Sequence, residues 1–122
     1  MKNTIHEFDP VIYPRRLWVV VNCPASVLNE WFEDKYEDLP ESASAEVVPA
    51  RRLKPDVLGG VLVRFKSKKD MTTSIITHES SHAAMEIYDY IGAKVDIQNQ
   101  EPFSYLTGWV ADCIDKVKKG KV

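Results

Sequence analysis

Two histidines and a glutamate occur in a pattern typical of metal-dependent hydrolysis: His78, Glu79 and His82. If residues 77–84 form a helix, the two histidines lie one turn apart on the same face. Two imidazoles at this spacing can bind one zinc ion, and Glu79 is placed to take a proton from a zinc-bound water. The helix is apolar or small almost all round, which indicates a buried helix. The spacing therefore predicts a zinc site there.

A catalytic zinc ion keeps three protein ligands and leaves one position for water, so a third ligand is needed. The remaining histidine, His6, is far away in the sequence. Glu101 is the better choice because it lies at the start of the next expected helix. Gly92 is expected to end the first helix, Asn99 to cap the second, and Pro102 to occupy its first turn. An ordinary acid favoured by the helix dipole is the alternative interpretation of Glu101.

Together the two stretches resemble the gluzincin metallopeptidases, in which HExxH is followed by a glutamate on the next helix. In this chain 18 residues separate His82 from Glu101. The run from Asn99 to Gly108 is similar to the glutamate helix of that family, and the resemblance covers about residues 71–109. The resemblance implies one zinc ion per chain, with His78, His82 and Glu101 as its ligands. It also implies that Glu79 is the general base.

Three further side chains are secondary candidates. Tyr105 stands four residues after Glu101, where the family has an aspartate, and it could donate a hydrogen bond to a developing oxyanion. A tyrosine in the core is the alternative. Glu86 or Asp89 could orient a ligand histidine through its second ring nitrogen. Both could equally be solvated charges.

The expected fold class is α+β and zincin-like, with a small sheet of about three strands packed on three helices and zinc between the second and third. One domain is expected over residues 1–122, with residues 1–16 as an extended arm. The HExxH helix is followed by the glutamate-bearing helix. Hydrophobic periodicity and breaker residues place the other elements. These are strands at 17–21, 45–53 and 57–66 and a helix from Pro24 to about Tyr36.

Residues 60–66 alternate apolar and charged side chains, which is typical of an outer strand. Members of the resembled family use such a strand to hold an extended substrate by backbone pairing. The alternative is an ordinary sheet edge. Gly59 and Gly60 at its start indicate a bulge or bend.

Composition excludes some functions. The net charge of −2 gives no electrostatic case for nucleic acid. The run from Leu17 to Val21 is too short to span a membrane. Cys23 and Cys113 are expected to be free thiols in a reducing cytoplasm, with one bridge as the alternative. No secretion signal is expected at the N-terminus.

The sequence thus predicts a cytoplasmic, zinc-dependent metallopeptidase that acts on a peptide or protein substrate, without nucleic-acid or membrane partners. A homo-oligomer or a protein partner could complete the cleft. Two alternatives stay open. One is a non-catalytic or regulatory binding module, and the other is a zinc hydrolase acting on a small amide.

Overall fold

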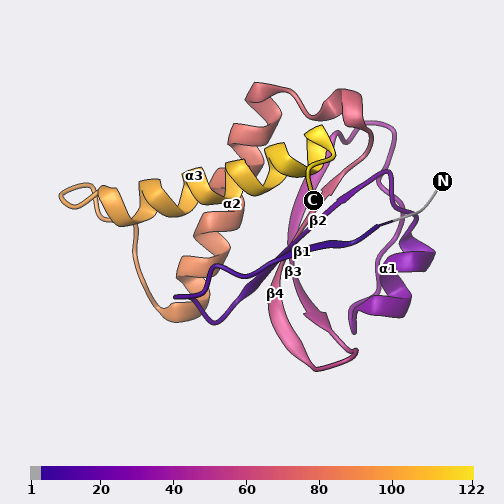
Figure 1. The fold of residues 1–122 in the computed structure, drawn as a ribbon, viewed down its shortest axis with the longest axis horizontal. Coiled ribbons are helices and arrows are strands. Elements are labelled where there is room, and N and C mark those ends of the chain that lie inside the picture. Colours follow the sequence, from indigo (N-terminus) through magenta and orange to yellow (C-terminus); the bar gives the residue numbers. More distant parts are fainter. Residues whose placement is uncertain (1–3) are drawn as a thin grey trace.

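The computed structural model describes residues 4–122 and has an α+β architecture (Figure 1). A four-stranded mixed sheet is combined with three α-helices and a short 3-10 helix. In chain order the elements are β1 (His6–Phe8), β2 (Arg16–Val21), α1 (Ala25–Trp31), β3 (Ala45–Arg52), β4 (Leu58–Phe65), η1 (Lys68–Asp70), α2 (Thr73–Ile91) and α3 (Glu101–Lys119).

The strands are ordered β1-β2-β4-β3 across the sheet. β2 and β4 run parallel, whereas β1 and β3 pair antiparallel with their neighbours. The prediction of about three strands was one too few, because residues 6–8 of the expected arm pair with β2. Residues 1–3 of that arm lie outside the described part of the chain.

The prediction of an outer strand at residues 60–66 is wrong. β4 pairs with β2 on one side and with β3 on the other, so its backbone has no free edge for a substrate. The charged residue that suggested solvent, Arg64, is buried beside Glu46. Nor do the two glycines make a bulge, since pairing continues through Gly59 and Gly60. Gly60 instead allows the backbone of Arg16 to pack closely against β4, because a Cβ at position 60 would lie 2.1 Å from the backbone oxygen of Arg16.

The helices divide between the two faces of the sheet. α2 and α3 cover one face, and α1 lies on the other (Figure 1). Alternation along β2 supplies both cores, because Leu17 and Val19 face the long helices while Trp18 and Val20 face α1. The expectation that this strand is buried on both faces is confirmed.

The ends of the two long helices follow local rules. The Thr72 side chain accepts a hydrogen bond from the Ile75 backbone N–H, and Gly92 ends α2 in the left-handed region. Pro102 lies in the first turn of α3, as expected, although the N-cap is Gln100 and not Asn99. α1 is shorter than predicted, because its helical backbone ends at Trp31.

Candidate functional site

The two motif histidines lie in solvent on the outer side of α2. His78 and His82 are both exposed, and their Nε2 atoms are 3.2 Å apart. The composition of this helix predicts burial on all sides, and that prediction is wrong. A different side of α2 faces the core. Of His78, Glu79 and His82, only Glu79 is buried, at 8% exposure. The buried stripe comprises Ile76, Glu79, Ser80, Ala83, Ala84, Ile87 and Tyr88.

The zinc prediction is wrong. Within residues 4–122, no group of three or more His, Cys, Asp and Glu side chains could hold a metal ion. Glu101 does not join the histidine pair, because the first turn of α3 packs elsewhere. Phe103 stacks edge-on against Tyr88, with ring centroids 5.3 Å apart. That contact is more than a turn beyond His82 and on the buried side of α2.

Because this ligand set does not form, the resemblance to the gluzincins is not supported. The prediction of a zinc ion between the second and third helices is wrong for the same reason. His6, the third histidine, lies in β1. Peptide hydrolysis with Glu79 as the base stays an untested prediction. The expected mechanism, however, required a zinc-bound water.

The secondary candidates are spread over two helices. Tyr105 is 75% exposed, so it is not a core tyrosine. Asp89 is exposed and Glu86 is half-buried. Among the hydrogen bonds of residues 4–122, each motif histidine contacts only the other histidine. The orienting role predicted for Glu86 or Asp89 has no hydrogen bond to support it.

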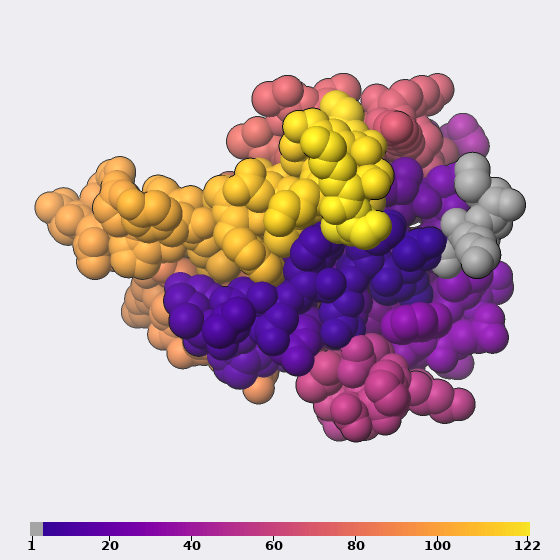
Figure 2. Space-filling view, viewed as in Figure 1, coloured from indigo at the N-terminus to yellow at the C-terminus, as the bar shows by residue number. Residues whose placement is uncertain are grey.

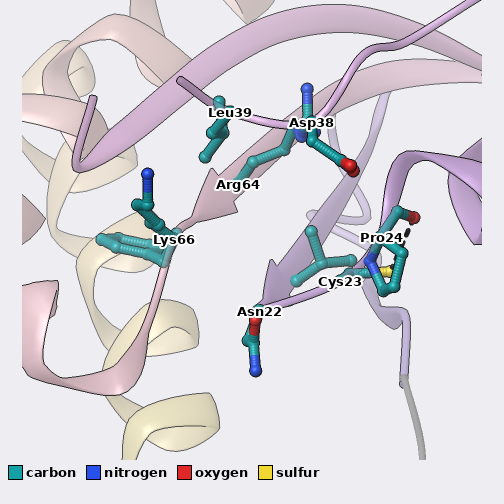
Figure 3. A pocket seen from close by; sticks show the side chains of 9 residues that line it. Asn22, Cys23, Pro24, Asp38, Leu39, Arg64 and Lys66 are labelled. Carbon is teal, nitrogen blue, oxygen red and sulfur yellow. Dashed lines mark hydrogen bonds between the residues drawn. The ribbon is translucent and has the colours of Figure 1, made fainter. Parts of the chain in front are cut away.

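A cavity that the sequence did not suggest opens at the carboxyl ends of the parallel strands β2 and β4 (Figure 3). Its volume is about 240 Å³. Crevices at the carboxyl ends of parallel strands are common ligand sites. The lining residues are Val20, Asn22, Cys23, Pro24, Asp38, Leu39, Arg64, Phe65 and Lys66.

The charged groups of this cavity are already engaged by the chain itself. Arg64 donates to the Glu46 carboxylate at 2.9 Å and to the Glu37 carbonyl oxygen at 2.8 Å. Lys66 donates to the carbonyl oxygen of Pro40, and the Asp38 carboxylate accepts from a backbone N–H of α1. These contacts stabilise the loop before β3 and leave the charges little capacity for a ligand.

The cysteine of the cavity is a poor nucleophile. Burial raises the pKa of the Cys23 thiol above its ordinary value, and the nearby Arg64 guanidinium opposes this shift more weakly. The thiol is therefore protonated at neutral pH, whereas the thiolate is the reactive form. Cys23 and Cys113 are both free, as predicted.

Comparison with protein-family models, with curated proteins and with solved structures gave no match. Among residues 4–122, no helix has the length and apolar character needed to cross a membrane. The functional argument therefore depends on the surfaces of the chain itself.

Proposed function

We propose that this protein is a non-catalytic binding module that holds a protein segment on an exposed apolar surface. This surface, called the arm–α3 surface below, lies where the N-terminal arm meets the first half of α3 (Figure 2). It contains a hollow of about 340 Å³. Its residues are Pro10, Ile12, Tyr13, Pro102, Tyr105, Leu106 and Trp109.

The exposure of this surface is the observation that carries the proposal. Ile12 is 79% exposed and Tyr105 is 75% exposed, and the neighbouring Val11 is 82% exposed. Single apolar side chains in solvent are common, but a contiguous group of them marks an interaction site. Tyrosine and tryptophan are also the residue types that most often dominate binding energy at interfaces.

The backbone of the arm holds these side chains outward at an energetic cost. Val11 has a φ of 70°, and the Ile12 N–H donates to the Pro10 carbonyl oxygen at 2.7 Å, which closes a γ-turn. The Asp9 carboxylate accepts a further bond from the Val11 N–H. A β-branched residue in this region is strained by about 1–3 kcal/mol. Strain of this kind is concentrated at functional surfaces, which supports the proposal.

Charge at the rim of the surface indicates the chemistry of the partner. Glu101 and Asp112 flank Tyr105 along the exposed side of α3. Neither acid forms an ion pair within residues 4–122. A complementary segment would therefore present bulky apolar side chains next to lysine or arginine. The free thiols fit our further proposal that the protein acts in the reducing cytoplasm.

The test uses a random peptide display library as the probe and the Tyr105→Ser and Ile12→Ser variants. Selected peptides should combine bulky apolar residues with lysine or arginine. Tyr105→Ser should weaken their binding by at least about tenfold, which is the loss expected for an interface anchor. The matched control is Val122→Ser, because Val122 is 58% exposed but lies outside the arm–α3 surface. This control should bind as the unaltered protein does.

Two results would contradict the proposal. Selected peptides could bind the Tyr105→Ser and Val122→Ser variants equally well, which would place the binding site elsewhere. Alternatively, sedimentation could show a dimer that Tyr105→Ser dissociates, and the surface would then be covered by a second copy of this chain.

A further inference from the structure

One arginine differs from the others in its electrostatic partners. The chain has five arginines, and four of them lie within 4 Å of a carboxylate. Arg15 is the exception within residues 4–122. The four pairs are Arg16 with Glu7 and Asp9, Arg51 with Glu33, Arg52 with Glu7, and Arg64 with Glu46.

The guanidinium of Arg15 is nevertheless held in one position. Its Nη2 donates to the Gly60 carbonyl oxygen at 3.2 Å, and the group lies 4.0 Å from the centroid of the Tyr90 ring. Gly59 allows this packing, because a Cβ at that position would lie 2.3 Å from Nη1 of Arg15. The Nε atom of Arg15 is buried and has no hydrogen-bond acceptor among residues 4–122. The described part of the chain thus fixes a cation without a counter-charge.

This cation lines an open groove of about 430 Å³ at the end of β3. A second arginine, Arg51, borders the groove with a side chain that is 58% exposed and reaches Glu33 only at 3.9 Å. The one acid in the lining, Asp34, accepts hydrogen bonds from the Tyr36 hydroxyl and the Arg51 backbone N–H. The lining comprises Arg15, Asp34, Pro49, Ala50, Arg51, Val57, Gly59 and Tyr90.

We propose that this groove binds the phosphate group of a phosphate monoester, with Arg15 as the main contact and Arg51 as the second. The planar guanidinium has the geometry to donate two parallel hydrogen bonds to a phosphate. A monoester carries about two negative charges at neutral pH, which suits two arginines better than a carboxylate would. Because the chain already orients Arg15, little side-chain freedom is lost on binding.

The experiment is an NMR titration of the full chain with inorganic phosphate, phosphoserine and adenosine monophosphate. The Arg15 side-chain signal and the backbone signals around Gly59 should shift together. Arg15→Gln should weaken phosphate affinity by at least about tenfold, since charge-assisted hydrogen bonds are lost. The matched control is Arg16→Gln, because Arg16 is the sequence neighbour but is paired with Glu7 and Asp9. This control should change the affinity by less than about twofold.

Comparison of the ligands identifies the source of the phosphate. Tighter binding of phosphoserine would assign a phosphopeptide, and tighter binding of adenosine monophosphate would assign a nucleotide. If acetate bound with the same affinity as phosphate, the assignment of phosphate as the ligand would be wrong. Equal losses in Arg15→Gln and Arg16→Gln would overturn the site, because they would indicate non-specific attraction.

Arg15 also packs against Gly59 and Tyr90, so its replacement could lower stability. Arg51→Gln provides an independent test, because Arg51 is exposed and lies outside that packing. We expect a loss of about threefold in phosphate affinity, and no loss would contradict the site. The proposal does not depend on the arm–α3 surface, and Tyr105→Ser should leave phosphate binding unchanged.

Discussion

The two faces of the sheet are stabilised in different ways. The face under α2 and α3 buries a large set of mainly aliphatic side chains, with Glu79 and Ser80 as its buried polar residues among those described. The face under α1 has a smaller core in which Trp18 and Phe32 meet edge-on, with ring centroids 5.0 Å apart. Arginines are buried beside that smaller core, each with a carboxylate.

The difference follows from the lengths of the helices. α2 and α3 each have 19 residues, so their packing on the sheet is distributed over many contacts. α1 has seven residues, and a helix of that length is not stable without tertiary contacts. It therefore depends on a few large contacts. Glu7 is one of their supports, because its carboxylate accepts from the Trp18 indole N–H at 2.7 Å and also contacts Arg52.

The largest expected effect tests this dependence. Phe32→Ala should lower the free energy of unfolding by about 4–5 kcal/mol, because it removes an aromatic contact from the smaller core. Leu106→Ala, in the larger core, should cost only about 2–3 kcal/mol, because α3 keeps its other contacts. Urea denaturation measures both. The comparison of the two faces fails if Leu106→Ala is the more damaging change.

Two glycines allow a sharper test of intermediate size. Gly60→Ala should destabilise the protein by about 1–3 kcal/mol, because the new Cβ would collide with the Arg16 backbone and the Trp18 ring of the smaller core. Gly108→Ala should stabilise it by about 0.5–1 kcal/mol, since Gly108 lies within α3 with nothing close to a new Cβ. Thermal unfolding should show shifts of opposite sign. Shifts of the same sign would contradict the close approach at Gly60.

The smallest effect concerns pH and the larger face. His6 pairs with Val19 in the sheet, and burial lowers the pKa of its imidazole below the ordinary value of 6.5. The unfolded chain then binds more protons than the native state as pH falls below 6.5. His6 should therefore reduce stability on acidification, and His6→Gln should reduce this loss between pH 7.5 and about pH 5.5. An unchanged pH dependence of the urea midpoint in His6→Gln would show that burial of His6 is unimportant.

Much of the secondary structure could be predicted from the sequence, because its signals are local. Gly92 ends α2, and Pro102 lies in the first turn of α3, as the sequence predicts. The apolar run at residues 17–21 gave a strand buried on both faces. The errors have a common cause, which is that sequence neighbours do not show what packs beside them. Arg64 alternates with apolar residues as in an outer strand, yet Glu46 of the adjacent strand allows its burial.

The candidate sites show the same limit. The spacing of His78 and His82 correctly placed both on one side of a helix, and no local signal could tell whether that side faced the core or solvent. The Arg15 groove has a faint sequence signal in Gly59 and Gly60, although by themselves these two glycines indicate a bulge or bend. Only the pairing of β4 with β2 shows that they make room for Arg15 and for the backbone of Arg16.

By itself, then, the sequence determined where the main helices and strands lie and that Gly92 ends α2, because hydrophobic period and glycine conformation act over a few residues. Only the tertiary structure decided that the histidine pair faces solvent, that Glu101 lies apart from it, and that Arg15 is fixed with no carboxylate partner in the part of the chain described. These features depend on contacts between residues far apart in the chain, and such contacts are set by how whole faces pack together.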